Sequence, residues 1–469
     1  MKSFNQRHLF LQVIKAAIVI ICCSASASAQ ALAGESPATD KAVSIGEFLT
    51  HLEKENQFMG SVAVMEDGKK IFAKAYGRLG EASDQPIPAN DRTKYRIGSI
   101  TKTFTSTMIL QLAEAGKIVV DDKLSKFFPK VENADSITID QMLRHQSGIG
   151  SMTSDPEYLE WCYGEFSRAD VMEKILAQPV QFEPGEKTEY SNSNFVLLGY
   201  IIEDLAGKTY NEVLQSKICG PLKLKDTYYG KKANADENEA ISYSFKSDKW
   251  TAERETHMSI PHGAGAIVST PSDLAKFMTA LFGGKLINEK SLAGMSNVSS
   301  ENGTLGQGLF SFPFHEKKAF GHGGGIDGFQ SNLAYFPEEK VVMAVCANGV
   351  RYPLNDVMIG ILSREFGASP ELPSFKTVEV DLETIKRYAG VYETDKFPMD
   401  ITIGDDGKNL TAQATGQGQI SMEATSDVAF KFDAAGIRMK FVKSDSGAFD
   451  MEFKQGPAAL TFSKKKDDE

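Results

Sequence analysis

Residues 95–102 read YRIGSITK and place Ser99 three positions before Lys102. From Ile100 onward apolar residues recur with helical spacing, and Gly116 is a stop signal for that helix. Residues three apart lie on one helix face, so we expect Lys102 beside Ser99. A serine hydroxyl needs a base to become a nucleophile, and the start of a helix offers backbone N–H groups to an oxyanion. The stretch therefore predicts a nucleophilic serine at the start of a helix.

An SxxK spacing is weak evidence by itself because both residues are common. Ser463 and Lys466 repeat the spacing near the end of the chain. The alternative interpretation is a helix-capping serine followed by a solvated lysine. The context of Ser99 has to decide between the two interpretations.

Two further motifs follow Ser99 in order. Residues 190–192 read YSN and open a predicted helix, and residues 322–325 read HGGG at the start of a predicted strand. Serine β-lactamases and penicillin-binding proteins combine SxxK with a later S-D-N and a later K-T-G. Here Tyr190 replaces the serine of the second motif and His322 replaces the lysine of the third. The candidate site residues are Ser99, Lys102, Tyr190, Asn192, His322, Gly323, Gly324 and Gly325.

The chain resembles class C β-lactamase-like serine hydrolases, a group that includes D-aminopeptidases, D,D-carboxypeptidases and carboxylesterases. The resemblance runs from about residue 44 to residue 365. It rests on residues 95–102, 143–148, 182–192, 198–203, 264–275 and 321–329. It implies an α+β fold of the β-lactamase/transpeptidase type, with an antiparallel sheet flanked by helices and a helical lobe.

The resemblance also implies a mechanism. Ser99 attacks a carbonyl and forms an acyl-enzyme that water later hydrolyses. Lys102 and Tyr190 share the acid and base work, and the sequence leaves open which of them takes the Ser99 proton. The backbone N–H groups of Ser99 and Gly325 would form an oxyanion hole. Asn192 would bind Lys102 or the substrate amide, and no cofactor is implied.

Each assignment has a plainer alternative. Asn192 could be only a helix cap, Tyr190 a core aromatic, and residues 323–325 a tight turn. We interpret His145 and His262 as structural, because the sequence pairs neither with an acid or a metal. Arg96 is expected to pack or pair beneath the site.

His322 departs from the lysine of the third motif, and this difference bears on the substrate. A lysine there would give a substrate carboxylate a permanent cation, whereas histidine is only partly charged near neutral pH. This favours hydrolysis of small amides, D-amino-acid peptides or esters over β-lactam hydrolysis. The alternatives are a β-lactamase and a non-catalytic penicillin-recognising sensor. The chain has no GxSxG elbow, which disfavours an α/β-hydrolase.

The C-terminal part has a different pattern. Strand-like alternation recurs at 401–403, 430–432, 437–441 and 449–453, which predicts a small antiparallel β-barrel or sheet. Residues 388–392 resemble part of the β-rich accessory domain found in some relatives. The expected domains are a hydrolase domain over 44–367, a linker over 368–378 and the β-rich domain over 379–469.

The N-terminus resembles a secretory signal. Basic residues precede an apolar run at 16–23, and Ala27-Ser28-Ala29 predicts cleavage after Ala29. We therefore expect a periplasmic or secreted protein with a flexible leader over 30–43 and no membrane span after cleavage. A membrane anchor and a lipoprotein at Cys22 or Cys23 are the alternatives.

The net charge and the cysteine content limit the kinds of binding partner and of metal site that we expect. The whole chain has a net charge of −11, and loss of residues 1–29 removes three basic residues, which leaves 48 basic against 62 acidic. An acidic protein without basic blocks is a poor nucleic-acid binder, so the expected partner is a small-molecule or short-peptide substrate. Three cysteines remain, which allows one disulfide at most, and no CxxC or HExxH spacing supports a zinc site. The oligomeric state is not predicted.

Overall fold

The computed structural model describes residues 38–82, 85–246, 249–298, 305–432, 435–444, 447–455 and 458–465. The chain divides into two compact units that separate between Val350 and Arg351. The domain boundary expected over 368–378 stays a prediction. The predicted signal sequence and the start of the leader, residues 1–37, lie outside the described residues.

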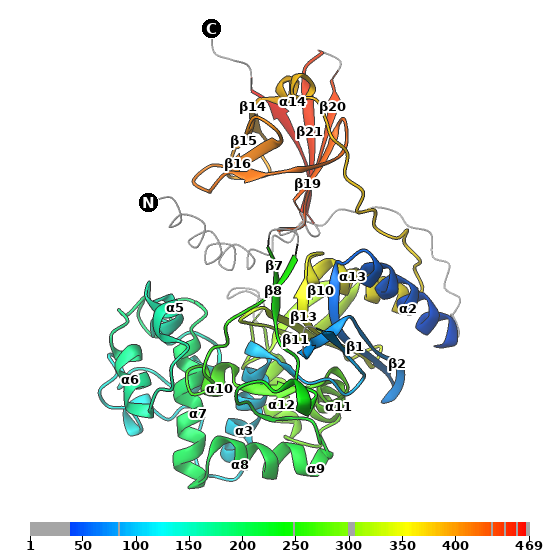
Figure 1. The fold of residues 1–469 in the computed structure, drawn as a ribbon. Helices are drawn as coiled ribbons and strands as arrows, with labels where there is room; N and C mark the ends of the chain where they lie inside the picture. The colour runs from blue at the N-terminus through cyan, green and yellow to red at the C-terminus, as the bar shows by residue number, and fades with distance from the viewer. Residues whose placement is uncertain are drawn as a thin grey trace. The chain divides into compact units, whose positions relative to one another are not determined.

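A six-stranded antiparallel sheet is the framework of the first unit (Figure 1), with strand order β10-β11-β12-β13-β1-β2. Its strands are β1 (Phe58–Glu66), β2 (Lys69–Tyr76), β10 (Phe310–Phe314), β11 (Lys317–Ile326), β12 (Phe329–Phe336) and β13 (Val341–Val350). The β1–β2 hairpin turns at Asp67 and Gly68, both with positive φ, as the Asp-Gly pair predicts. Strands β12 and β13 pair across the turn at residues 337–340.

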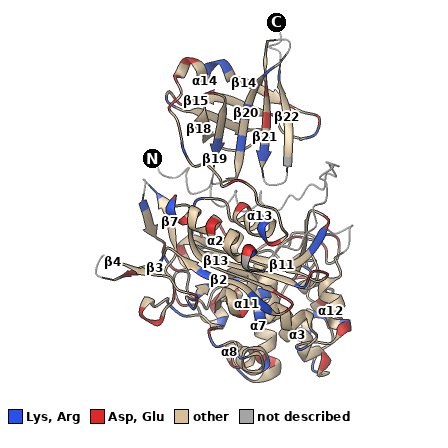
Figure 2. Ribbon diagram, turned by 90° about the vertical axis from the view of Figure 1, so that its right-hand side faces the viewer, with Lys and Arg blue, Asp and Glu red and all other residues tan. Residues whose placement is uncertain are grey.

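Two helices cover this sheet. Helices α2 (Ala38–Lys54) and α11 (Pro271–Phe282) both contact β1 and lie on opposite faces of the sheet (Figure 2). Residues 58–64 of β1 are accordingly all buried. Helix α11 is capped by Thr270, whose side chain accepts from the Asp273 N–H, and Pro271 is its first residue.

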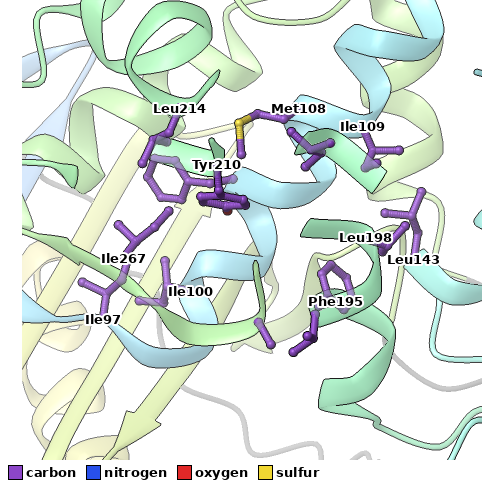
Figure 3. Packing of buried hydrophobic residues seen from close by; sticks show 14 of the residues in the cluster. Ile97, Ile100, Met108, Ile109, Leu143, Phe195, Leu198, Tyr210, Leu214 and Ile267 are labelled. Carbon is purple, nitrogen blue, oxygen red and sulfur yellow. The ribbon is translucent and has the colours of Figure 1, made fainter. Parts of the chain in front are cut away.

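A helical lobe packs around α3 (Thr101–Glu114), whose residues 101–110 are all buried (Figure 3). The other helices of this unit are α4 (Ile139–Leu143), α5 (Tyr158–Trp161), α6 (Arg168–Leu176), α7 (Asn192–Ala206), α8 (Tyr210–Leu214), α9 (Gly220–Leu222), α10 (His262–Gly265) and α12 (Glu289–Ser296). Helices α7, α8 and α10 contact α3 directly. The predicted helix after Asn192 ends at Gly207, which has φ +61° and caps it.

Three small sheets complete the first unit. The three-stranded sheet joins β5 (Tyr95–Arg96), β9 (Ile267–Ser269) and β6 (Tyr228–Tyr229), with β9 in the middle. The other two are the pairs β3 (Arg78–Ala82) with β4 (Gln85–Pro88) and β7 (Tyr243–Lys246) with β8 (Lys249–Ala252). Strand β5 leads directly into residues 97–102, so this small sheet fixes the approach to α3.

The second unit contains α13 (Leu354–Glu365), α14 (Leu382–Tyr388) and a nine-stranded antiparallel sheet. In spatial order the strands are β17 (Ile420–Ser421), β16 (Leu410–Ala414), β15 (Ile401–Asp405), β14 (Gly390–Glu393), β22 (Ala458–Lys464), β21 (Phe449–Gln455), β20 (Ile437–Lys443), β19 (Ala429–Phe432) and β18 (Glu423–Ser426). The two edge strands, β17 and β18, are separated in the chain only by Met422, so the sheet curls into a nearly closed barrel. The predicted α+β fold with a C-terminal β-rich part is confirmed.

Cys162, Cys219 and Cys346 are buried free thiols. Ser463, the start of the second SxxK match, lies in strand β22 and not on a helix. Among the residues that the structure describes, no helix is long and apolar enough to cross a membrane. Within the same residues, no group of three His, Cys, Asp or Glu side chains could hold a metal ion.

Candidate active site

Ser99 is the one residue between Tyr95 and Leu110 that is not buried. It lies in the 3₁₀ turn Gly98–Ile100, which leads into α3. The small sheet holds the residues before it, since the Ile97 N–H donates to the Ile267 carbonyl at 3.0 Å. The result is a partly exposed hydroxyl at the start of a buried helix, as the sequence predicts.

Lys102 is buried and its Nζ has three partners. It lies 3.1 Å from Ser99 Oγ, 2.8 Å from Asn192 Oδ1 and 2.7 Å from the Ala264 carbonyl oxygen. Burial lowers the pKa of Lys102 well below its usual value. A neutral amine has two N–H groups and one lone pair. Two of the three partners can only accept, so the lone pair is left for the Ser99 hydroxyl.

Tyr190 lies two residues before the first residue of α7, and its side chain is within interaction range of Ser99. Its ring centroid is 4.9 Å from Lys102 Nζ, and the ring stacks on His145 with 4.3 Å between centroids. Burial raises the pKa of Tyr190 above its usual value, and the interaction with Ser99 opposes that shift. The phenol therefore holds its proton at neutral pH beside Ser99 and is not merely a core aromatic.

Asn192 is the first residue of α7 and makes three hydrogen bonds. Its Oδ1 accepts from Lys102, its Nδ2 donates to Thr153 Oγ1 at 2.9 Å, and its backbone N–H donates to Ser151 Oγ at 3.1 Å. The N-cap is Ser191, so the alternative that Asn192 is only a cap is wrong. Sequence reasoning missed Ser151, which holds the Asn192 backbone, and Thr153, which orients its amide, because no motif marks either residue.

Residues 323–325 lie inside strand β11, so the alternative of a tight turn is wrong. Strand β10 pairs with β11 only as far as Gly321, and Gly323 and Gly325 are exposed beyond it. Gly324 alone requires the absence of a side chain, because a Cβ there would lie 2.0 Å from the Ile97 carbonyl oxygen. The backbone edge of β11 is thus open to a ligand just where the glycines begin.

The Gly325 backbone lies against the turn that carries Ser99. A Cβ on Gly98 would be 2.8 Å from the Gly325 nitrogen and 2.9 Å from its oxygen. Gly98 has φ +50°, and this close approach leaves no room for a side chain. The structure therefore brings Ser99, Lys102, Tyr190, Asn192 and residues 323–325 together.

His322 is buried, with 3 % of its surface exposed, and packs edge-on against Phe310. Its Nδ1 donates to the Gly323 carbonyl, and its buried Nε2 has no hydrogen-bond partner among the described residues. Burial lowers the pKa of His322 to about 3, and any positive charge on Lys102 acts in the same direction. The expectation that His322 is partly charged near neutral pH is therefore wrong.

The other two histidines near the site differ from each other. His145 Nδ1 accepts from the Ser191 N–H at 3.0 Å, and burial keeps its pKa well below the usual value. His262 Nε2 lies 3.5 Å from Glu203 Oε2, so the expectation that His262 lacks an acidic partner is wrong. His262 begins the short helix α10, which supplies the Ala264 carbonyl to Lys102.

Comparison with known proteins identifies the family. The Beta-lactamase family model matches residues 48–361. The chain belongs to the beta-lactamase family. The chain is a serine hydrolase by this membership, which agrees with the geometry around Ser99.

Individual relatives are distant in sequence. The chain is 28% identical over 273 residues to the putative penicillin-binding protein PbpX of Bacillus subtilis, which covers 58% of this chain and 67% of PbpX. It is 27% identical over 309 residues to a teichoic acid D-alanine hydrolase of Staphylococcus aureus, with 64% and 75% covered. The crystal structure of a D-stereospecific amidohydrolase from Streptomyces sp. matches with a TM-score of 0.59 and 27% identity, over 70% of this chain and 98% of that one.

Proposed function

We propose that this protein is an exported serine hydrolase that forms an acyl-enzyme on Ser99 with small D-amino-acid amides, peptides or esters. The observation that carries the proposal is the position of Lys102 Nζ, 3.1 Å from Ser99 Oγ and held by two pure acceptors. This arrangement leaves the amine lone pair for one purpose, to take the serine proton.

In this proposal Lys102 is the base of acylation. As Ser99 Oγ bonds to the substrate carbonyl carbon, its proton moves to Lys102 Nζ. The carbonyl π electrons move to oxygen, whose negative charge is stabilised by the N–H groups of Ser99 and Gly325. The tetrahedral intermediate collapses, the bond to the leaving group breaks, and Tyr190 gives that group its proton and regains one from Lys102. Water then hydrolyses the acyl-enzyme by the reverse sequence of proton transfers.

The neutral state of His322 supports the proposed substrate class. An uncharged imidazole gives a substrate carboxylate no ionic partner, and such charge-assisted contacts are about twice as strong as neutral ones. The names of two relatives, teichoic acid D-alanine hydrolase and D-stereospecific amidohydrolase, both specify D-configured substrates. We propose the same stereochemical preference here.

A substrate panel tests the proposal. Purified residues 30–469 would be assayed with D- and L-alanine p-nitroanilide, p-nitrophenyl acetate and a chromogenic cephalosporin, with Ser99→Ala as the control. We expect turnover of the D-amide or the ester, with the D-amide preferred over its L-enantiomer. Efficient hydrolysis of the cephalosporin alone would make the protein a β-lactamase. No turnover and no fluorophosphonate adduct would make it a binding or sensor protein.

The domain limits and export are part of the same proposal. Residues 1–29 would be removed after Ala29, which leaves a periplasmic or secreted protein with a hydrolase domain over 44–367 and a β-rich domain over 379–469. Limited proteolysis should cut within the linker, 368–378, and leave an active N-terminal fragment. The mass of the exported protein should correspond to a chain that begins at Gln30. A nick in the linker that unfolds the whole chain would overturn these limits.

A further inference from the structure

Arg96 carries a buried charge three residues before Ser99. Its Nη1 donates to Asp327 Oδ2 at 2.9 Å and to the Thr256 carbonyl at 2.8 Å. Its Nη2 donates to Glu255 and, at 3.1 Å, to the Lys231 carbonyl. This confirms that Arg96 pairs beneath the site. Both side chains of the Arg96–Asp327 pair are only 2% exposed, so the pair is sheltered from solvent screening.

Asp327 stands two residues after Gly325. Asp327 and Gly328 form the turn between β11 and β12, in which Ile326 pairs with Phe329. Asp327 has φ +54°, a left-handed conformation that Asp tolerates in such turns. Its second carboxylate oxygen accepts from the Thr256 N–H at 2.8 Å and from Thr256 Oγ1 at 2.7 Å. The turn at the end of β11 is therefore held to Arg96 by the Asp327 carboxylate, both oxygens of which accept hydrogen bonds.

The residues that follow Arg96 and the residues on either side of Asp327 are in close van der Waals and hydrogen-bond contact. Ser331 Oγ donates to the Ile97 carbonyl at 2.9 Å, and Gly324 lies so close to that carbonyl that a Cβ would overlap it. The Gly98 and Gly325 backbones are in contact, as described for the site. Any movement of the Asp327 turn relative to Arg96 would therefore change the separation between residue 99 and residue 325.

We propose that Arg96 and Asp327 are a positioning pair, which holds the Ser99 and Gly325 N–H groups at the separation that an oxyanion requires. This inference rests on the proposed function of Ser99. Oxyanion donors act in the transition state and not in the ground state, so the loss of the pair should lower kcat and leave KM nearly unchanged. Loss of one whole donor costs about 10²–10³ in kcat, so a displaced donor should cost about 10–100-fold.

The decisive comparison is Asp327→Asn against Glu255→Gln. Each variant removes the negative charge of one acidic partner of Arg96 and replaces a carboxylate with an isosteric amide. Only Asp327 belongs to the turn between β11, which carries residues 323–325, and β12. Measurements would be kcat and KM with p-nitrophenyl acetate, the inhibition constant of phenylboronic acid, and the midpoint of urea unfolding. Phenylboronic acid adds covalently to a serine hydroxyl and becomes tetrahedral, so its affinity reports the oxyanion hole.

We expect Asp327→Asn to lower kcat and boronate affinity about 10–100-fold, with KM within about threefold of wild type. Glu255→Gln should lower stability but keep kcat within about threefold. Equal losses of kcat in both variants, or a loss of stability alone in Asp327→Asn, would overturn the positioning role. If Asp327→Asn does not fold, Arg96→Lys takes its place with the same expectation, since one ammonium cannot reproduce the guanidinium fork. A wild-type protein without turnover or a Ser99 adduct would instead overturn the proposed function.

Discussion

The interiors of the two parts of this molecule differ in what they bury. Around Ser99 the first unit buries Lys102, His145, His322 and Arg96, all of them ionisable. In the β-rich part the core cluster from Ile385 to Phe462 is entirely apolar or aromatic. Among its described residues from 379 onward, the buried polar side chains are those of Thr411 and Lys431.

The difference shows where the protein sacrifices folding stability in order to hold reactive groups. A buried ionisable group costs stability unless it is paired, and it responds by a shift of its pKa. Such groups cluster where reactions occur, and the lowered pKa values of Lys102, His145 and His322 therefore point to the surroundings of Ser99. The barrel interior instead packs aromatic rings, such as Tyr388 on Phe441 with 4.2 Å between ring centroids, as expected for a structural core.

The largest expected effect is that of Ser99→Ala. Loss of the nucleophile should lower kcat by about 10⁴–10⁶-fold. The Ser99 side chain caps no helix, so the free energy of unfolding should change by no more than about 1 kcal/mol. Intact-mass spectrometry with a fluorophosphonate should show one adduct on wild type and none on the variant. An adduct on the variant would place the nucleophile elsewhere.

Two buried lysines, one in each unit, allow a direct test of this difference between the two interiors. Lys102→Met removes the proposed base and should lower kcat about 10²–10⁴-fold. Lys431 of the barrel is also buried, but it pairs with Glu423 at 3.4 Å and lies 5.4 Å from the Phe375 ring centroid. Lys431→Met should therefore leave kcat/KM within about twofold. Comparable kcat losses in the two variants would show that lysine burial affects activity only through folding.

A pair of glycine-to-alanine variants tests close packing in the same way. Gly324→Ala would place a Cβ 2.0 Å from the Ile97 carbonyl oxygen, so β11 must move away from the Ser99 turn. A displacement of about 1 Å can cost about 10²-fold in rate. In the barrel, a Cβ added to Gly404 of β15 would lie 3.4 Å from Thr411 Oγ1, and Gly404→Ala should keep wild-type kcat. A Gly324→Ala variant with wild-type kcat would mean that the strand is not held against the nucleophile.

The features that the sequence predicted correctly are local ones. The Asp-Gly hairpin at 67–68, the helix from Asn192 to its Gly207 cap and the facing of Ser99 and Lys102 all depend on spacings of a few residues. The barrel strands were predictable for the same reason, since each is a short alternating run with a nearby partner.

The features that the sequence did not predict concern partners that are distant in the chain. No spacing indicates that Asp327 would meet Arg96 or that Glu203 would meet His262. The sequence does not predict the charge of His322, because its pKa depends on burial, which tertiary packing sets. The sequence predicted a strand at residues 323–325 but left a tight turn open, because a glycine run is compatible with both and pairing with β12 decides between them.

The smallest expected effect concerns stability against pH. His145 and His322 have folded-state pKa values below the unfolded value of about 6.5. Below that pH the unfolded chain binds protons that the folded unit does not, so acidification destabilises the first unit. Residues 379–469 contain no histidine, so the barrel should lack this sensitivity.

His322→Asn isolates one of these contributions. Between pH 7 and pH 5 the buried neutral His322 should cost about 2 kcal/mol of stability, because its folded pKa of about 3 lies below that window. The chain's two tryptophans, Trp161 and Trp250, both lie in the first unit, so tryptophan fluorescence during urea unfolding reports that unit alone. The wild-type free energy of unfolding should therefore fall by about 2 kcal/mol more than that of His322→Asn over this range. Parallel curves for the two proteins would mean that His322 takes up its proton at the same pH in the folded unit as in the unfolded chain, and is partly charged near neutral pH. In that case His322 would offer the substrate a cation after all, and the argument against a carboxylate-bearing substrate would fail with it.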